Sequence, residues 1–323
     1  MNLSFFTHSD GRCSLLLAMF VCIFLLSTEV EPSDDLKHYQ IQVDGLDRSY
    51  HLHYPPNFQN RAKGSTALFL FLHGGGKSSG EDVSKRIGLN ALADKNGFIA
   101  VYPDGVGSQW NDGRNGHLRK GEDISRVDDV HFFSVLLDHL QKIPQVNADQ
   151  TFVSGASNGG MMTLRLGCEL SERFTAISAI IANLPKNILP ECRPRAALPV
   201  LIMNGTEDPL VPWKGGMMKF LGNEGGEVTS TAENVAFWVA SNRCALTPKH
   251  RKLDNKSVRD RSTVETFDYD QCAGKSRVLL YQINHGGHHI PGIDSPELRF
   301  LVGNKNRDIQ AMEEIWKFFK EYL

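Results

Sequence analysis

The chain contains the segment Thr151-Phe152-Val153-Ser154-Gly155-Ala156-Ser157-Asn158-Gly159, in which Ser157 lies between two glycines at the end of a short apolar run. Residues 151–154 favour a strand, and residues from about 159 to 170 favour a helix. The glycines allow a sharp turn and close packing of the helix, so the serine hydroxyl projects from the tip of the turn. The segment therefore predicts a strand–turn–helix unit with a candidate nucleophile at Ser157. A tight turn without a catalytic role is the alternative.

Strands and helices alternate on both sides of this unit. The apolar run from Ala67 to Leu72 is continuous, which fits a strand that is buried on both faces of a parallel sheet. Further strands are expected at residues 98–102, 176–181, 200–204 and 278–283, and helices at 89–96, 128–142, 231–241 and 309–322. This alternation predicts an α/β fold with a doubly wound, mostly parallel sheet and right-handed crossovers.

Two segments depart from the alternation. Residues 38–54 alternate apolar and polar side chains around Asp44-Gly45, which predicts a β-hairpin. His51 and His53 share one face of its second strand and are expected to be solvated surface residues on an edge. Residues 244–272 are rich in charge and are expected to form an excursion whose cluster around Lys249 and Arg251 is a solvated face.

Composition excludes several classes of protein. The 323 residues are 41% apolar and 22% charged, with 35 Lys and Arg against 37 Asp and Glu. Such a chain can bury a core, so disorder is not expected. The near-balance of charge gives no attraction to nucleic acid. Nothing in the sequence indicates the oligomeric state.

The N-terminal segment has the pattern of an export signal. Leu15 to Leu26 form an apolar run after Arg12 and before polar sequence, which is typical of a signal peptide. The run is shorter than the roughly 20 residues that span a bilayer, so a permanent transmembrane helix is the less favoured alternative. We therefore expect a signal peptide over residues 1–30, a single catalytic domain over 36–323, secretion to an extracellular or periplasmic location, and no stable membrane partner.

The remaining cysteines are even in number. Removal of the signal peptide leaves Cys168, Cys192, Cys244 and Cys272, and an even count in an exported protein indicates disulfides. Sequential pairing is preferred among the three possible pairings, which the sequence alone does not distinguish. Four unpaired buried thiols are the alternative.

A serine nucleophile needs a base and a carboxylate that orients the base. Asp208 follows the strand expected at 200–204, and His288 follows the strand expected at 278–283. The carboxyl ends of parallel strands meet at one edge of the sheet, where ligands bind. Ser157, Asp208 and His288 are therefore the expected catalytic residues, in that chain order. Glu207 is the rival carboxylate, and Asp208 or His288 alone could instead be a turn or surface-loop residue.

Catalysis by acyl transfer also needs donors for the oxyanion of the tetrahedral intermediate. The backbone N–H of Asn158 directly follows the nucleophile. A second N–H is expected from the glycine run that follows the strand at 67–72, at Gly75 rather than Gly74. A plain turn is the alternative for this run.

These motifs together resemble the extracellular polyhydroxybutyrate depolymerase-type esterases, which are related to feruloyl and acetylxylan esterases and belong to the α/β-hydrolase superfamily. The resemblance covers the chain from about residue 36 to its end. The stretches that carry it are Leu72-His73-Gly74-Gly75-Gly76, Tyr102-Pro103-Asp104-Gly105, Trp110-Asn111, the turn at Ser157, Asn204-Gly205-Thr206-Glu207-Asp208 with Val211-Pro212, Trp238 with Cys244, and Gly287-His288 with Pro291-Gly292.

The resemblance implies a serine carboxylesterase of the α/β-hydrolase fold that acts through an acyl-enzyme, without cofactor or metal. Its substrate would be a polyester or a feruloylated or acetylated extracellular ester, which can be polymeric. Trp110 and Trp213 would line the acyl or alcohol site, with packing or rim positions as an equal alternative. The chain departs from the family at His289-Ile290, where Thr-Trp is common, so an aromatic wall beside the site would be missing.

Other functions remain open on the sequence. His285, His288 and His289 could bind zinc as imidazole ligands, although such a site would leave the turn at Ser157 unexplained. A binding protein without catalysis would usually have lost one of the three catalytic residues, and all three are present. Acyl transfer to a sugar would use the same acyl-enzyme as hydrolysis.

Overall fold

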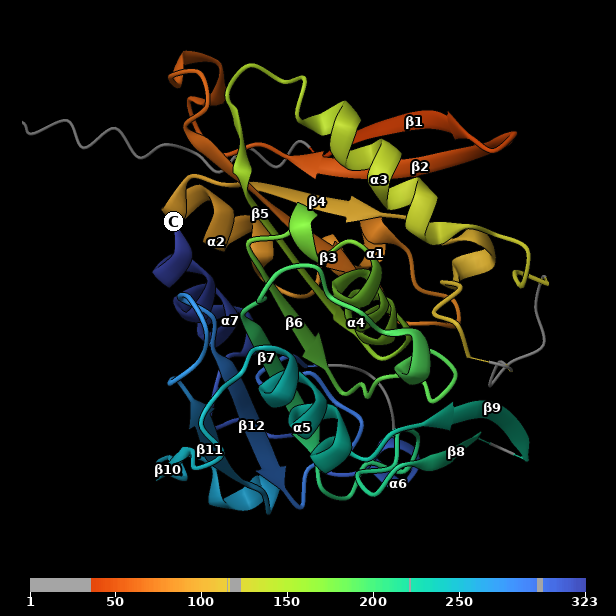
Figure 1. The fold of residues 1–323 in the computed structure, drawn as a ribbon, viewed down its shortest axis with the longest axis vertical. Coiled ribbons are helices and arrows are strands. Elements are labelled where there is room, and N and C mark those ends of the chain that lie inside the picture. Colours follow the sequence, from red (N-terminus) through yellow and green to blue (C-terminus); the bar gives the residue numbers. More distant parts are fainter. Residues whose placement is uncertain (1–35, 115, 117–122, 221, 295–298) are drawn as a thin grey trace, which may run out of the picture. The chain divides into compact units, whose positions relative to one another are not determined.

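Parallel strands form the centre of a ten-stranded sheet in the computed structural model, which describes residues 36–114, 116, 123–220, 222–294 and 299–323 (Figure 1). In spatial order these strands are β4 (Ile99–Pro103), β3 (Thr66–Leu72), β5 (Val146–Ala156), β6 (Ala176–Ile180), β7 (Val200–Gly205) and β12 (Val278–Asn284). Strand β5, which leads into Ser157, lies between β3, which precedes the glycine run, and β6, whereas β7 and β12, which precede Asp208 and His288, follow beyond β6 in the same parallel direction. The predicted doubly wound, mostly parallel sheet is confirmed.

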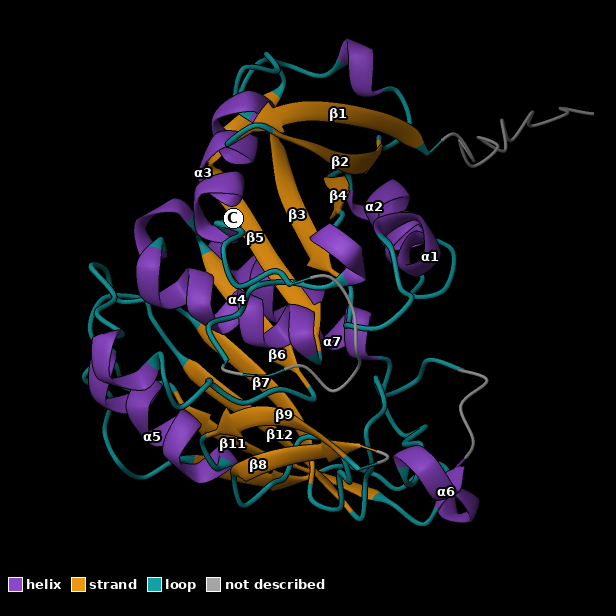
Figure 2. Ribbon diagram, turned by 90° about the vertical axis from the view of Figure 1, so that its right-hand side faces the viewer, coloured by secondary structure: helices purple, strands orange, loops and turns teal. Residues whose placement is uncertain are grey.

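The continuous apolar run of β3 has a direct explanation in this arrangement. Alternate β3 side chains belong to two separate cores, one containing Leu70 and the other Phe71. Helices cover both faces of the sheet (Figure 2). One face carries α3 (Asp129–Leu140), α4 (Asn158–Glu169) and α5 (Thr231–Ser241), and the other carries α1 (Gly80–Ser84), α2 (Leu89–Asn96) and α7 (Ala311–Phe319).

Antiparallel strands extend the sheet at both edges. The predicted hairpin is β1 (Lys37–Val43) and β2 (Leu46–His53), whose turn has positive φ at both Asp44 and Gly45. Positive φ at both central residues is the geometry that suits a two-residue hairpin turn. At the other edge, β10 (Lys249–Lys252) and β11 (Thr263–Tyr269) pair with β12. The charged excursion is therefore part of the sheet, and all four residues of its basic strand β10 are exposed, as expected.

The expectation for His51 and His53 was wrong. Strand β2 is not an edge strand, because β4 pairs with its second side. Both histidines are buried, and each ring nitrogen Nε2 contacts a carboxylate, His51 with Asp104 at 3.1 Å and His53 with Asp94 at 2.6 Å. Pairing with β4 thus converts an outer strand into an inner one.

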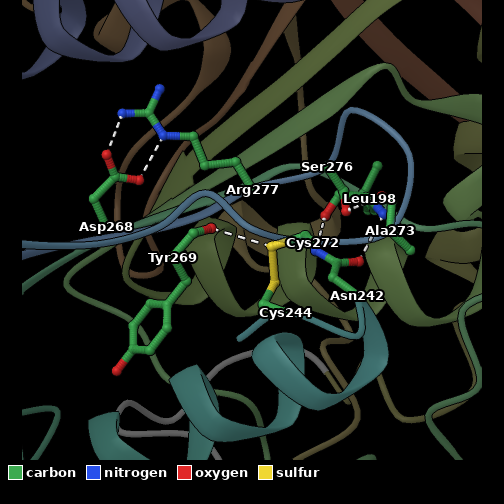
Figure 3. Close-up of a disulfide and its surroundings, with 9 residues drawn as sticks. All are labelled: Leu198, Asn242, Cys244, Asp268, Tyr269, Cys272, Ala273, Ser276 and Arg277. Carbon is green, nitrogen blue, oxygen red and sulfur yellow. Dashed lines mark hydrogen bonds and ion pairs between the residues drawn. A yellow bond between two sulfur atoms is a disulfide. The ribbon is translucent and has the colours of Figure 1, made fainter. Parts of the chain in front are cut away.

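Both disulfides join cysteines that follow one another in the chain, Cys168 with Cys192 and Cys244 with Cys272. The first ties the end of α4 to the loop before β7. The second ties the end of α5 to the turn between β11 and β12 (Figure 3). Beside it, the side chain of Asn242 bonds both backbone groups of Leu198. These links hold the helices of one face against the sheet.

Several short elements were not predicted, among them α1, β10 and β11. Strands β8 (Gly216–Phe220) and β9 (Asn223–Val228) form a separate hairpin, and α6 (Arg299–Val302) follows the loop of His288. The expected signal peptide lies outside the described residues. Within the described part of the chain, no helix is long and apolar enough to cross a membrane.

Candidate active site

Ser157 occupies a strained turn between β5 and α4. Its backbone has φ 56° and ψ −122°, a conformation that a residue with a side chain rarely adopts and that clusters at active sites. The flanking glycines make the turn possible. A Cβ at Gly155 would lie 2.4 Å from the carbonyl oxygen of Gly159, and a Cβ at Gly159 would lie 2.3 Å from that of Leu72. The turn therefore presents the serine hydroxyl at the carboxyl end of the sheet.

His288 reaches this hydroxyl from the loop after β12. Its Nε2 lies 3.0 Å from Oγ of Ser157, across 131 positions of sequence. The preceding residue must be glycine, because a Cβ at Gly287 would lie 2.0 Å from the carbonyl oxygen of Val302. Close packing of this loop against α6 thus fixes the position of His288 relative to Ser157.

Asp208 holds the other side of the imidazole. Its Oδ2 lies 2.7 Å from Nδ1 of His288, and its Oδ1 accepts the backbone N–H groups of Leu210 and Val211 at 2.8 Å each. The carboxylate side chain is only 2% exposed and the imidazole 10%. An ionised carboxylate can only accept, so Nδ1–H of His288 donates to Asp208 and Nε2 accepts the hydroxyl proton of Ser157. This is the tautomer that general-base catalysis requires.

The rival residues form a second pair beside the first. Oε1 of Glu207 lies 2.6 Å from Nδ1 of His285, and both side chains are more than half exposed. This pair makes no hydrogen bond to Ser157 among the contacts of the described residues. Consecutive carboxylates therefore bind different histidines, and only Asp208 faces the serine.

The glycine loop after β3 lies directly against the turn. A Cβ at Gly75 would be 3.4 Å from Cβ of Asn158, and one at Gly74 would be 3.6 Å from Cβ of Ser157. Asn158 is the first residue of α4, so its backbone N–H has no acceptor within the helix. The two N–H groups expected to bind an oxyanion, at Gly75 and Asn158, are thus on neighbouring segments beside the serine.

The side chain of Asn158 is locked in place below the site. Its Oδ1 accepts the backbone N–H of Trp110 at 2.8 Å, and its Nδ2 donates to the Trp110 carbonyl at 2.9 Å and to Oδ2 of Asp112 at 2.6 Å. All of these groups are buried. Sequence reasoning assigned a role only to the backbone of Asn158. The Asp112 that follows the Trp110-Asn111 motif was the signal that could have indicated a partner.

Trp110 does not line the substrate site, contrary to expectation. It is fully buried, its ring packs on that of His73 with centroids 4.9 Å apart, and Nε1 donates to the His73 carbonyl at 2.9 Å. Trp213 is half-buried and packs against the same core. Neither ring is part of the cavity wall that the described residues form. Trp110 therefore has a packing position, and Trp213 has a partly buried position outside this wall, which fits the alternative of a packing or rim tryptophan.

His73 supports the glycine loop as a neutral imidazole. Its Nε2 accepts the backbone N–H of Gly105 at 2.9 Å, so Nδ1 is the protonated nitrogen and donates to the Gly74 carbonyl at 2.8 Å. Burial lowers the pKa of His73 below its ordinary value, against a smaller opposite effect of the Gly74 hydrogen bond. A neutral ring is thus built into the base of the loop.

A cavity of about 480 Å³ opens at Ser157 and His288. Its walls are mostly apolar, and His289 and Ile290 are both part of the wall. The described residues that line it and that sequence reasoning missed include Phe71, Val83, Ile87, Gln109, Arg114, Ile181, Leu210, Met218, Ile293 and Leu301. They come from strands, helices and loops far apart in sequence, which explains why no motif indicated them.

The three histidines of the possible zinc site are not brought together as ligands. His285 and His288 bind separate carboxylates. No group of three or more His, Cys, Asp or Glu side chains in the described part of the chain is placed to hold a metal ion.

The chain is similar to known esterases over most of its length. The sequence profile of the family described as Phospholipase/Carboxylesterase matches residues 56–222. "Putative esterase NocK" of Nocardia uniformis subsp. tsuyamanensis is 31% identical over 284 residues, which are 85% of this chain and 79% of that protein. "Probable feruloyl esterase C" of Aspergillus flavus is 26% identical over 312 residues, 94% of this chain and 97% of that protein. These relatives confirm the resemblance to esterases that the motifs indicated.

Solved structures show the same fold. An acetyl xylan esterase from Aspergillus awamori superposes with a TM-score of 0.54 and 11% sequence identity, covering 88% of this chain and 99% of that one. At this identity the likeness extends to the fold alone. The fold is that of the α/β hydrolases.

Proposed function

We propose that this chain, which belongs to the phospholipase/carboxylesterase family and is a carboxylic-ester hydrolase, acts as a secreted serine esterase through an acyl-enzyme. The observation that carries the proposal is the contact series from Ser157 Oγ to His288 Nε2, at 3.0 Å, and from His288 Nδ1 to Asp208 Oδ2, at 2.7 Å. The three residues come from loops after different strands of one sheet.

The proposed reaction begins with attack of Ser157 Oγ on the ester carbonyl carbon while His288 Nε2 takes the hydroxyl proton. Asp208 stabilises the imidazolium that forms and keeps its ring in position. The carbonyl oxygen becomes an oxyanion, which the backbone N–H groups of Gly75 and Asn158 bind. Collapse of the tetrahedral intermediate expels the alcohol, which receives the proton from His288, and leaves an acyl ester on Ser157.

In the second half of the reaction, His288 takes a proton from water and the hydroxide attacks the acyl-enzyme. The intermediate uses the same two N–H donors, and its collapse returns the proton to Ser157 and releases the carboxylic acid. Oxyanion donors of this kind are each worth about 3 kcal/mol in the transition state. An alcohol in place of water would give acyl transfer, which product analysis separates from hydrolysis.

The proposed substrates are acylated extracellular compounds, either feruloyl or acetyl esters or a polyester. Similarity to a protein named as a probable feruloyl esterase supports the first class. The cavity of about 480 Å³ is open to the surface near Ser157 and has room for an acyl group larger than acetyl. Secretion through residues 1–30 is proposed because the mature domain, residues 36–323, contains two disulfides, which persist in oxidising compartments.

The test uses the full mature domain with Ser157→Ala as the variant. We expect the variant to fold like the wild type. Its kcat on p-nitrophenyl esters should fall by about ten-thousandfold or more. A fluorophosphonate should label the wild type at Ser157, located by peptide mass, and leave the variant unlabelled. Labelling of another residue, or near wild-type turnover in Ser157→Ala, would refute the proposal. A panel of acetylated sugars, feruloylated sugars and hydroxybutyrate oligomers then separates the substrate classes.

A further inference from the structure

Arg114 is a buried arginine on the wall of the same cavity as Ser157 and His288. Its side chain is only 4% exposed. Burial of a guanidinium costs free energy unless its N–H groups have hydrogen-bond acceptors. The partners of each nitrogen therefore indicate the role of Arg114.

Two of the three nitrogens are held by the protein. Nε donates to Asp112, 2.9 Å from Oδ1 and 2.8 Å from Oδ2. Nη1 donates to the Gly225 carbonyl at 3.2 Å and contacts Sδ of Met218 at 3.1 Å. The β8–β9 hairpin therefore fixes the plane of the guanidinium from one side, and Asp112 fixes it from the other.

The third nitrogen, Nη2, has no acceptor among the described residues. It is also not among the side-chain atoms that are both fully buried and without a partner, so it keeps some solvent exposure. An N–H donor that is rigidly aimed and accessible from a mostly apolar cavity is suited to bind an acceptor atom of a ligand. Arginine loses little freedom on such binding, because its planar fork is already oriented.

We propose, on the basis of the proposed esterase function, that Arg114 determines substrate specificity by donating a hydrogen bond from Nη2 to an oxygen atom of the ester substrate other than the reacting carbonyl. The oxygen belongs to a neutral group such as an ether, a hydroxyl or a second ester. A carboxylate is disfavoured, because Asp112 already neutralises the guanidinium.

Other polar groups on the cavity wall are less suited to this role. Arg86 is exposed, and its Nε donates to the Asp82 carbonyl. Asp294 is exposed and pairs with Arg307 at 2.7 Å. Charges in water discriminate weakly, since solvent competes for every contact. Arg114 alone among these charged groups is buried and held on two sides.

The experiment compares esters that differ only by one oxygen in place of a methylene. On the acyl side the pair is p-nitrophenyl 3-methoxypropanoate and p-nitrophenyl pentanoate. On the alcohol side the pair is 2-methoxyethyl acetate and butyl acetate. The quantity measured is the ratio of kcat/KM within each pair, for the wild type and for Arg114→Gln, so that reactivity differences between the esters cancel.

We expect the ratio to favour the oxygen-containing ester in the wild type on one of the two sides, and to fall by about ten- to hundredfold in Arg114→Gln. The side on which it falls identifies whether the acyl or the alcohol group contacts Arg114. A uniform loss of rate on all esters, with the ratio unchanged, would show a purely structural role and overturn the inference. So would a wild type without preference on either side.

Two further variants keep the test decisive. Asp112→Asn with Arg114→Gln replaces the ion pair by a neutral pair, and it should show the same fall in ratio if Arg114→Gln alone does not fold. Arg173→Gln removes an arginine that pairs with Asp138 at 2.7 Å outside the cavity, and both ratios should stay at the wild-type value. Failure of the esterase function itself would appear separately, as retained hydrolysis of p-nitrophenyl pentanoate by Ser157→Ala.

Discussion

Nδ2 of Asn158 donates a hydrogen bond of 2.6 Å to Oδ2 of Asp112 in the core directly below Ser157. Asn158 supplies a backbone N–H to the proposed oxyanion site, and Asp112 also binds Arg114. The first turn of α4 is therefore connected through one carboxylate to the wall of the substrate cavity.

This connection predicts a large effect of Asn158→Ala. The substitution leaves the buried Trp110 N–H without its acceptor and removes one of the two donors to Oδ2 of Asp112, and an unsatisfied buried group costs about 1–3 kcal/mol. We expect a lower free energy of unfolding in urea and a fall in kcat, with KM little changed, because the backbone donor shifts. The control is Asn96→Ala, whose amide bonds the Leu92 carbonyl on the surface. Wild-type kcat in Asn158→Ala would contradict the prediction.

The two neighbouring carboxylate–histidine pairs predict opposite outcomes. In Asp208→Asn and in His288→Ala, kcat should fall by about 10³-fold or more, as is usual when such residues are replaced. Glu207→Gln and His285→Ala should retain most of their turnover, because that pair is exposed and does not contact Ser157. Steady-state kinetics on one p-nitrophenyl ester compares all four variants. If Glu207→Gln were the inactive carboxylate variant, the assignment would move by one residue.

The disulfides predict a stability difference that peptide mapping and unfolding can measure. Removal of the Cys244–Cys272 bond, which spans 28 residues, should lower the free energy of unfolding by ~3–4 kcal/mol in the chain-entropy account. Cys244→Ser with Cys272→Ser is compared with Cys168→Ser and Cys192→Ser, which open a span of 24 residues. We expect losses of similar size. Equal stability of wild type and the first double variant would refute a structural role for that bond.

Because His73 is buried as a neutral imidazole, we expect the free energy of unfolding to fall in mild acid. Burial lowers the pKa of this histidine in the folded state, whereas in the unfolded chain it is about 6.5. Below about pH 6.5 the unfolded chain therefore binds a proton that the folded chain does not, so stability falls as pH falls, by up to about 1.4 kcal/mol per pH unit. Unfolding free energies at pH 7.5 and 5.5 should differ less in His73→Gln than in the wild type. An unchanged difference would exclude His73 as the cause.

Local patterns in the sequence were sufficient to predict the parallel strands of the sheet and the chain order of the candidate catalytic residues. The apolar run at 66–72 and the helix at 231–241 were predicted nearly to the residue, because hydrophobic periodicity depends only on neighbours in the chain. Placement of Ser157, Asp208 and His288 at one edge followed from parallel strands alone, since their carboxyl ends lie together.

Only the tertiary structure decided which side chains face the core and which face the cavity. The sequence gives no sign that Trp110 lies under the site, that His51 is covered by pairing of β2 with β4, or that β8 and β9 hold Arg114 at the cavity wall. Each of these depends on segments tens of residues away that approach in space. Periodicity and turn chemistry determine the elements of this protein, whereas the direction of a loop side chain is set by long-range packing, which no local pattern records.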